Sequence, residues 1–200
     1  MSRRLLVVAL FVTWLFAGSL QAQRGAIVRP TPLNELSERA DRIVHVHVIS
    51  ARIEPLEKYQ HFSSVVVTVS VEDTLKGPAA KQITFRQLIW DARDRYDLAG
   101  YRKGREFLMF LLNPNADGLS GTVGLDQGRM EVMHEASGET VVHPKLPSRM
   151  LLRGAQEAAA RKGTSLPQSL RIAAQTDRST FLLADMKTAV RELVRKEQTK

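Results

Sequence analysis

Hydrophobic and polar positions alternate most clearly in residues 64–77, with the sequence SVVVTVSVEDTLKG. Every second residue from Val65 to Val71 is a valine, and two of the three positions between them are hydroxylated. β-Branched side chains that alternate with polar ones are typical of a strand buried on one face. The Lys-Gly-Pro sequence at 76–78 then predicts a turn, because glycine frees φ and proline lacks a backbone donor. We therefore predict a central antiparallel strand that ends in this turn.

Six other segments have strand patterns. They are residues 43–52, 82–89, 106–112, 122–125, 129–135 and 140–143. Residues 106–112, EFLMFLL, are apolar at nearly every position, which predicts a strand covered on both faces. The polar segments 54–62 and 90–104 are expected to be loops. The last two strands predict a hairpin whose turn is either Ser137-Gly138 or Gly138-Glu139.

Helical patterns occur before the first strand and after the last one. Residues 34–40 predict a short helix with Asn34 as its N-cap, and the alanine-rich segment 148–162 predicts a longer helix. Residues 180–196 predict an amphipathic helix with Ser179 as its N-cap. A polar connection that contains proline is expected between the last two helices.

Strands followed by helices, without alternation of the two, indicate an α+β fold. We predict a predominantly antiparallel β-domain over residues 37–144, formed as a small OB-like barrel or a curved sheet of five to seven strands. Residues 23–36 are expected to be an extended lead-in. Residues 145–200 are expected to be a C-terminal helical segment packed on the barrel.

The first 22 residues have the three-part pattern of a secretory signal peptide. Arg3 and Arg4 precede the apolar run 5–17, and a polar exit with small residues follows, so cleavage is expected after Ala22. The alternative is an uncleaved membrane anchor, but the apolar run is shorter than the roughly 18–20 residues that span a bilayer. We predict export to the periplasm or secretion, with no integral membrane segment after cleavage.

The chain contains no cysteine, which excludes disulfides, thiolate metal sites and a cysteine nucleophile. An exported chain without disulfides depends on its hydrophobic core and suits a bacterial periplasm. Removing residues 1–22 takes away two arginines and no acid, so the formal charge becomes (29 − 2) − 21 = +6. This charge suits a solvated surface or contact with an anionic envelope polymer. Nucleic acid is not an expected partner, because no long basic run or aromatic-interleaved basic patch is present.

Three short motifs are similar to those of exported domains. They are Ala40-Asp41 before the first strand, Leu75-Lys76-Gly77 after the second, and GREFL at residues 104–108. Residues 37–133 resemble a pattern in uncharacterised exported bacterial proteins and, more distantly, the netrin-like domains of tissue inhibitors of metalloproteinases. The resemblance implies an OB-like five-stranded barrel. It does not extend to protease inhibition, because the disulfides and the N-terminal cysteine of that family are absent here.

The candidate for recognition is the predicted loop 90–104, WDARDRYDLAGYRKG. Aromatic and arginine side chains are enriched in binding hot spots, and loops on a β-scaffold often carry recognition. The candidate binding residues are Trp90, Arg93, Arg95, Tyr96, Tyr101 and Arg102. The alternative is a solvated loop whose aromatic side chains cover one end of the barrel.

His45 and His47 are candidate metal ligands. Their spacing on a strand places both imidazoles on one face, as in zinc and copper sites. His134 and His143 lie opposite each other only if the hairpin turn is Gly138-Glu139, and His61 is a further candidate. Alternatively, these histidines make ordinary hydrogen bonds on an outer face.

The sequence has no G-x-S-x-G, H-E-x-x-H, phosphate-binding or dinucleotide motif, and no cofactor is expected. We therefore predict an exported non-enzymatic binding or structural protein of the cell envelope. It is expected to recognise a protein or an anionic polymer through residues 90–104. The alternative is a metal-binding or metal-dependent protein that uses His45 and His47.

Overall fold

The structure is a computed structural model that describes residues 28–195, so the predicted signal peptide lies outside the described residues. The helices and strands, in chain order, are α2 (Leu33–Arg39), β1 (Arg42–Leu56), β2 (Tyr59–Lys76), β3 (Gln82–Ile89), β4 (Glu106–Leu111), β5 (Arg129–His134), β6 (Thr140–His143), α3 (Ser148–Leu151), α4 (Ala155–Arg161), α5 (Gln168–Ala173), β7 (Phe181–Leu182) and α6 (Leu183–Val194). Short 3-10 helices lie in the loops, namely η1 (Ala92–Arg95), η2 (Leu98–Gly100) and η3 (Leu125–Gly128).

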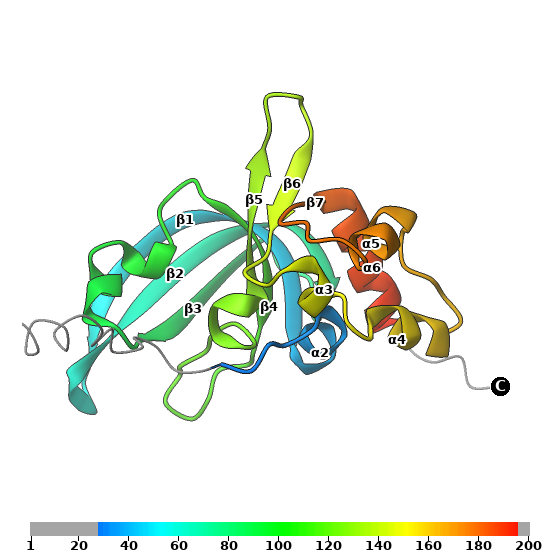
Figure 1. Cartoon of the computed structure of the whole chain (residues 1–200). Coiled ribbons are helices and arrows are strands. Elements are labelled where there is room, and N and C mark those ends of the chain that lie inside the picture. The colour runs from blue at the N-terminus through cyan, green and yellow to red at the C-terminus, as the bar shows by residue number, and fades with distance from the viewer. Residues whose placement is uncertain (1–27, 196–200) are drawn as a thin grey trace, which may run out of the picture.

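The strands form one antiparallel sheet in the order β3-β2-β1-β4-β5-β6-β7. The long strands β1 to β3 curve together on one side of the molecule, and the C-terminal helices gather on the other (Figure 1). The predicted α+β class, with mostly antiparallel strands and a C-terminal helical segment, is confirmed. The sheet is not closed. Of the two predicted forms, it is therefore a curved sheet and not a barrel. β2 is not central as predicted, because it lies next to the edge strand β3 and β4 occupies the middle.

β1 and β2 are longer than predicted, because their pairing continues through the polar segment 54–62. The register runs without a break from Ser50 opposite Thr68 to Pro55 opposite Ser63. β1 ends at Leu56, and β2 begins at Tyr59 after a tight turn. Backbone hydrogen bonds to a neighbouring strand do not depend on apolar side chains. An ion pair between Glu54 and Arg86 of β3 adds to this polar end of the sheet. The prediction of a loop at 54–62 was therefore wrong.

The alternation in β1 divides the core into two clusters, one on each face of the sheet. Val44, Val46 and Val48 pack with valines of β2 and aromatic residues of β3 and β4. On the other face, Ile43 packs with residues of β4, β5 and β6 and with the helices. Every residue of β4 is buried, as its apolar sequence predicted, and β4 contributes side chains to both clusters.

The chain between β4 and β5 is not the strand predicted at 122–125. Thr122 makes a single antiparallel bridge to Leu111, and Ser120 makes a single parallel bridge to Gln87 of β3. The Ser120 N–H also donates to the carbonyl oxygen of Arg86 at 2.7 Å. The glycine-rich sequence here gives turns and η3 rather than a ladder. These contacts bring the segment 112–125 back against the edge strand β3.

The helices differ from prediction mainly at their ends. Pro32 is the N-cap residue of α2, so Asn34 lies inside the helix and is not its N-cap. The predicted helix 148–162 is divided into α3 and α4 at Gly154, which has a φ of +72°. The short helix α5 was not predicted.

The last predicted helix starts later than expected, because the sheet uses its first residues. Phe181 pairs with Val142 of β6 as part of the two-residue strand β7. α6 then begins at Leu183, and Ser179 is not its N-cap. Its buried face joins the cluster under the helices, which fixes α6 against the sheet.

Candidate functional site

Trp90 follows β3 directly and leaves the core at that point. Ile89, the last residue of β3, is buried, whereas Trp90 is 70 % exposed. The loop that follows is shaped by aspartates. The Asp91 carboxylate accepts a hydrogen bond from the Arg93 N–H at 2.9 Å, and Asp97 accepts one from the Gly100 N–H at 3.2 Å. Such side-chain caps stabilise the first turns of η1 and η2.

Tyr101 was predicted as a binding residue, and the structure corrects this prediction. Its side chain is fully buried and lies edge-on to Phe85 and Phe107, with ring centroids 5.5 Å and 5.9 Å away. Its hydroxyl donates to Gln87 Oε1 at 2.8 Å, and burial raises its pKa to about 12. Tyr101 is therefore a core residue that anchors the loop to the sheet.

The remaining predicted residues lie on the surface of the loop. Arg93 is held by Asp91, with Nε 3.0 Å from Oδ1, and Tyr96 is 92 % exposed. Arg95 and Arg102 are also exposed. Of the predicted binding residues, Trp90 lines two cavities.

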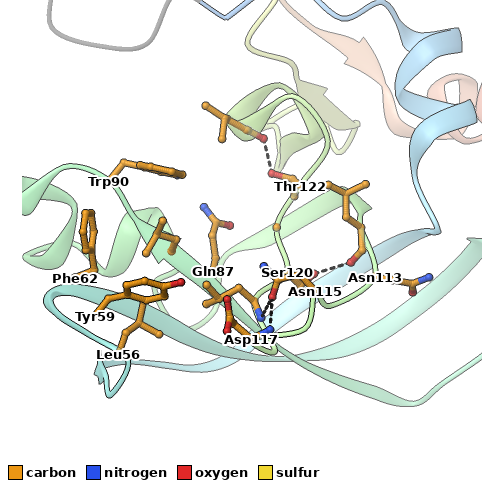
Figure 2. Close-up of a pocket in the computed structure, with 15 residues that line it drawn as sticks. Leu56, Tyr59, Phe62, Gln87, Trp90, Asn113, Asn115, Asp117, Ser120 and Thr122 are labelled. Carbon is orange, nitrogen blue, oxygen red and sulfur yellow. Dashed lines mark hydrogen bonds between the residues drawn. The ribbon is translucent and has the colours of Figure 1, made fainter.

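Trp90 forms part of a cleft of about 590 Å³, which we call the apolar cleft. Three segments line it: the β1–β2 hairpin, the end of β3 and the segment 112–125. Figure 2 shows the aromatic side chains of Tyr59, Phe62 and Trp90 on one side of the cleft, with the segment 112–125 opposite them. Tyr59 and Phe62 are more than two-fifths exposed, so their rings present apolar surface to solvent. Exposed aromatic residues that converge on one cleft are typical of a binding site.

The polar side chains of the opposite wall mostly hold that wall together. Asn115 Oδ1 accepts hydrogen bonds from the N–H groups of Asp117 and Leu119, at 3.0 Å and 2.9 Å. Ser120 Oγ donates to the Leu112 carbonyl oxygen at 2.6 Å, and Thr122 Oγ1 donates to that of Leu125. Because these groups already have partners, the surface that the cleft offers to a ligand is mainly aromatic and aliphatic.

A second cavity, of about 1070 Å³, also has Trp90 in its lining, and we call it the acidic cavity. It shares Gln87, Leu88, Trp90 and Leu125 with the apolar cleft. Its lining includes four aspartates, Asp91, Asp94, Asp97 and Asp126. Burial raises the pKa of Asp94, and the charges of the other three aspartates raise it further. The charge of Arg93 lowers this pKa, but the three aspartates and burial outweigh it.

The acidic cavity also contains cationic side chains, but its two arginines are directed at protein groups. Arg129 is largely buried, and its guanidinium carbon lies 4.4 Å from the centroid of the Tyr101 ring. Its Nη2 is 3.1 Å from Asp126 Oδ1. Arg105 donates from Nε to Glu131 at 2.9 Å and from Nη1 to the Gly100 carbonyl oxygen at 2.8 Å. Lys145 is exposed at the edge of the cavity.

His45 and His47 share one face of β1, as predicted, and both approach the carboxylate of Glu106 on β4. His45 is buried and hydrogen-bonded to Glu106 through Nε2. Its Nδ1 lies 3.0 Å from Nζ of Lys187 on α6. Because a lysine ammonium can only donate, Nδ1 accepts, and His45 is neutral with its proton on Nε2. His47 Nε2 is further away, 3.6 Å from Glu106 Oε2.

This network links α6 to the sheet. Nζ of Lys187 is also 3.1 Å from Oδ2 of Asp73 on β2, and Nη2 of Arg191 donates to the same oxygen at 2.7 Å. Burial lowers the pKa of His45, and the Lys187 charge lowers it further. Burial acts to raise the pKa of Glu106, but hydrogen bonds from His134 and His45 outweigh it, so this pKa is lowered.

His134 and His143 do not lie opposite each other, as they would with a Gly138-Glu139 turn. His134 is opposite Thr140 and His143 is opposite Glu131, so the turn is longer than either predicted two-residue turn. His134 Nε2 is instead 2.9 Å from Glu106 Oε2. Among residues 28–195, no three His, Cys, Asp or Glu side chains form a group that could hold a metal ion. Both ring nitrogens of His45 already have protein partners.

Sequence reasoning missed most of the apolar cleft. Tyr59 and Phe62 fall in the segment 54–62 that was interpreted as a polar loop, and of the segment 112–125 only its two ends, residue 112 and residues 122–125, were interpreted as strand. The available signal for a binding surface was the presence of two aromatic residues, Tyr59 and Phe62, in an otherwise polar segment between two predicted strands. Their convergence with Trp90 depends on the bend of the β1–β2 hairpin, which the local pattern does not encode.

Comparisons of the chain with protein-family models, with curated proteins and with solved structures gave no match. Within residues 28–195, the helices are all too short or too polar to cross a membrane.

Proposed function

We propose that this chain is an exported, non-enzymatic binding protein of the cell envelope, and that it binds an apolar segment of a partner protein in the apolar cleft. The observation that carries the proposal is the convergence of Tyr59, Phe62 and Trp90 on one side of that cleft. Export is supported by the signal-peptide pattern of residues 1–22.

The composition of the cleft favours a protein segment over an anionic polymer. Its accessible surface is mainly aromatic and aliphatic, and a volume of about 590 Å³ accommodates a few side chains. The loop arginines lie outside the cleft, and Arg93 is already paired with Asp91. Aromatic residues in such clefts contribute much of the binding energy, and removing one costs about 2 kcal/mol or more.

The proposal can be tested by site-specific photo-crosslinking in the envelope of the producing cell. A photoreactive phenylalanine analogue at position 62 should capture a partner protein. The same group at position 150 is the control, because Met150 is exposed but lies on α3, outside the cleft. Adding Trp90→Ala should reduce capture from position 62 at least tenfold. Equal capture from positions 62 and 150, or capture that Trp90→Ala leaves unchanged, would contradict the proposal.

The competing interpretation, an anionic polymer bound by the loop, has a separate test. Retention of the protein on heparin should be unaffected by Trp90→Ala. If Arg93→Ala with Arg95→Ala abolishes binding of the natural partner while Trp90→Ala does not, the polymer interpretation replaces the protein one.

A further inference from the structure

We propose that the bound segment is cationic as well as apolar, with a large hydrophobic residue in the apolar cleft and a neighbouring lysine or arginine in the acidic cavity. This inference rests on the proposed function, because it assigns the chemistry of the segment that binds at the same site. The partner is therefore a protein with an exposed basic and apolar stretch.

The two cavities are neighbours at Trp90, which belongs to the lining of both. They share Gln87, Leu88, Trp90 and Leu125, so a segment that packs against one face of Trp90 has the acidic cavity within reach of its next residues. A residue in an extended chain advances about 3.3 Å, and long basic side chains reach further. One short segment can thus contact both cavities.

Two of the four aspartates in the lining, Asp91 and Asp126, are paired with Arg93 and Arg129, so the charge preference depends on Asp94 and Asp97. Arg105 and Arg129 are bonded to Glu131 and Asp126 and to backbone carbonyl oxygens. Asp94 is exposed on the loop, and the charges of Asp91, Asp97 and Asp126, which raise its pKa, outweigh that of Arg93, which lowers it. A cation placed beside Asp94 relieves repulsion among carboxylates, whereas an anion adds to it.

Asp94 and Asp97 are the carboxylates through which this charge preference can be changed with little effect on the fold. Asp97 caps η2 through its Oδ1, and asparagine keeps an oxygen acceptor in the same place. The variant Asp94→Asn/Asp97→Asn therefore removes two charges and keeps the loop. Asp177→Asn is the matched control, because Asp177 is an exposed aspartate in the connection between α5 and β7.

The test measures Trp90 fluorescence in residues 23–200, where Trp90 is the only tryptophan because the other, Trp14, lies in the predicted signal peptide. The probes are two synthetic peptides with the same Leu-Phe-Leu centre, one flanked by lysines and the other by glutamates. We expect the lysine peptide to bind about tenfold more tightly at low salt, which corresponds to roughly 1.4 kcal/mol. The preference should disappear in the double variant, persist in Asp177→Asn, and weaken at high salt.

The outcomes separate this inference from the proposed function. If both peptides bind equally and Phe62→Ala, which removes another aromatic ring of the cleft and keeps the Trp90 signal, weakens both at least tenfold, the cleft binds apolar segments and the charge inference is wrong. Tighter binding of the glutamate peptide also overturns the inference and points to the loop arginines. If neither peptide changes the fluorescence of Trp90, both proposals fail.

Discussion

The two aromatic residues at the ends of the loop 90–104, Trp90 and Tyr101, have opposite roles. Trp90 is 70 % exposed at the apolar cleft, whereas Tyr101 is buried between Phe85 and Phe107. Composition alone placed both in one binding set, because hot-spot enrichment applies to residue types and not to burial. Only the packing of the loop on the sheet separates the exposed ring from the buried one.

A single glycine, Gly128, is required at the end of η3, whose first residue, Leu125, lines the apolar cleft. A Cβ at Gly128 would lie 2.5 Å from the Val123 carbonyl oxygen and 2.9 Å from its nitrogen. Gly128→Ala should lower the free energy of unfolding by roughly 1–3 kcal/mol, because backbone atoms must move to make room. Urea unfolding measures this loss.

Gly121→Ala provides the matched control, since a Cβ there meets nothing closer than Gln87 Cγ at 3.9 Å. We expect its free energy of unfolding to stay close to that of the original protein. Equal losses in the two alanine variants would contradict the role assigned to Gly128.

At the scale of elements, helix α6 is attached to the sheet by polar contacts as well as by apolar packing. Lys187 donates to His45 and pairs with Asp73, and its side chain is only 15 % exposed. The helical stripe in the sequence predicted the apolar contacts of α6. The polar ones depend on the position of β1 and β2 beneath the helix and were not predictable from the stripe.

Lys187→Ala should loosen α6 from the sheet. The variant leaves Nδ1 of the buried His45 without its donor, which costs about 1–3 kcal/mol. Hydrogen exchange of the α6 amides should become faster, while exchange in β4 changes little. Thr188→Ala, one residue away on the exposed face of α6, is the control. Similar exchange in the two variants would show that Lys187 does not hold the helix.

At the scale of the whole molecule, the His45–Glu106 network makes stability depend on pH. The unfolded chain protonates His45 below its ordinary pKa of 6.5, whereas the folded protein keeps it neutral to lower pH. The unfolded state then binds more protons, so the free energy of unfolding falls as the pH drops below about 6.5. The lowered pKa of Glu106 continues this loss below its ordinary value of 4.5.

His45→Gln tests the first part of this pH dependence. Glutamine can donate to Glu106 and accept from Lys187, but it does not titrate. Between about pH 7 and pH 5, the variant should lose less stability than the original protein, whose slope from one proton is at most about 1.4 kcal/mol per pH unit. Urea unfolding at several pH values measures both slopes, and parallel profiles would exclude His45 as the titrating group.

The sequence by itself determined the elements that have a strong local pattern. The alternating valines of β2, the continuous apolar run of β4 and the amphipathic pattern of α6 were all predicted. Burial on one face selects apolar residues at regular spacing, and burial on both faces selects them at every position. The loop 90–104 was also predicted, together with the presence of Trp90 in it.

Only the tertiary structure decided the features that depend on long-range pairing. The polar ends of β1 and β2 are strands because each has the other as a backbone partner, and Phe181 belongs to β7 because β6 lies beside it. The apolar cleft joins residues 56–62, the end of β3 and residues 112–125, which are distant in the sequence. No local period records such a meeting, since it follows from how the sheet curves and how the chain returns to its edge.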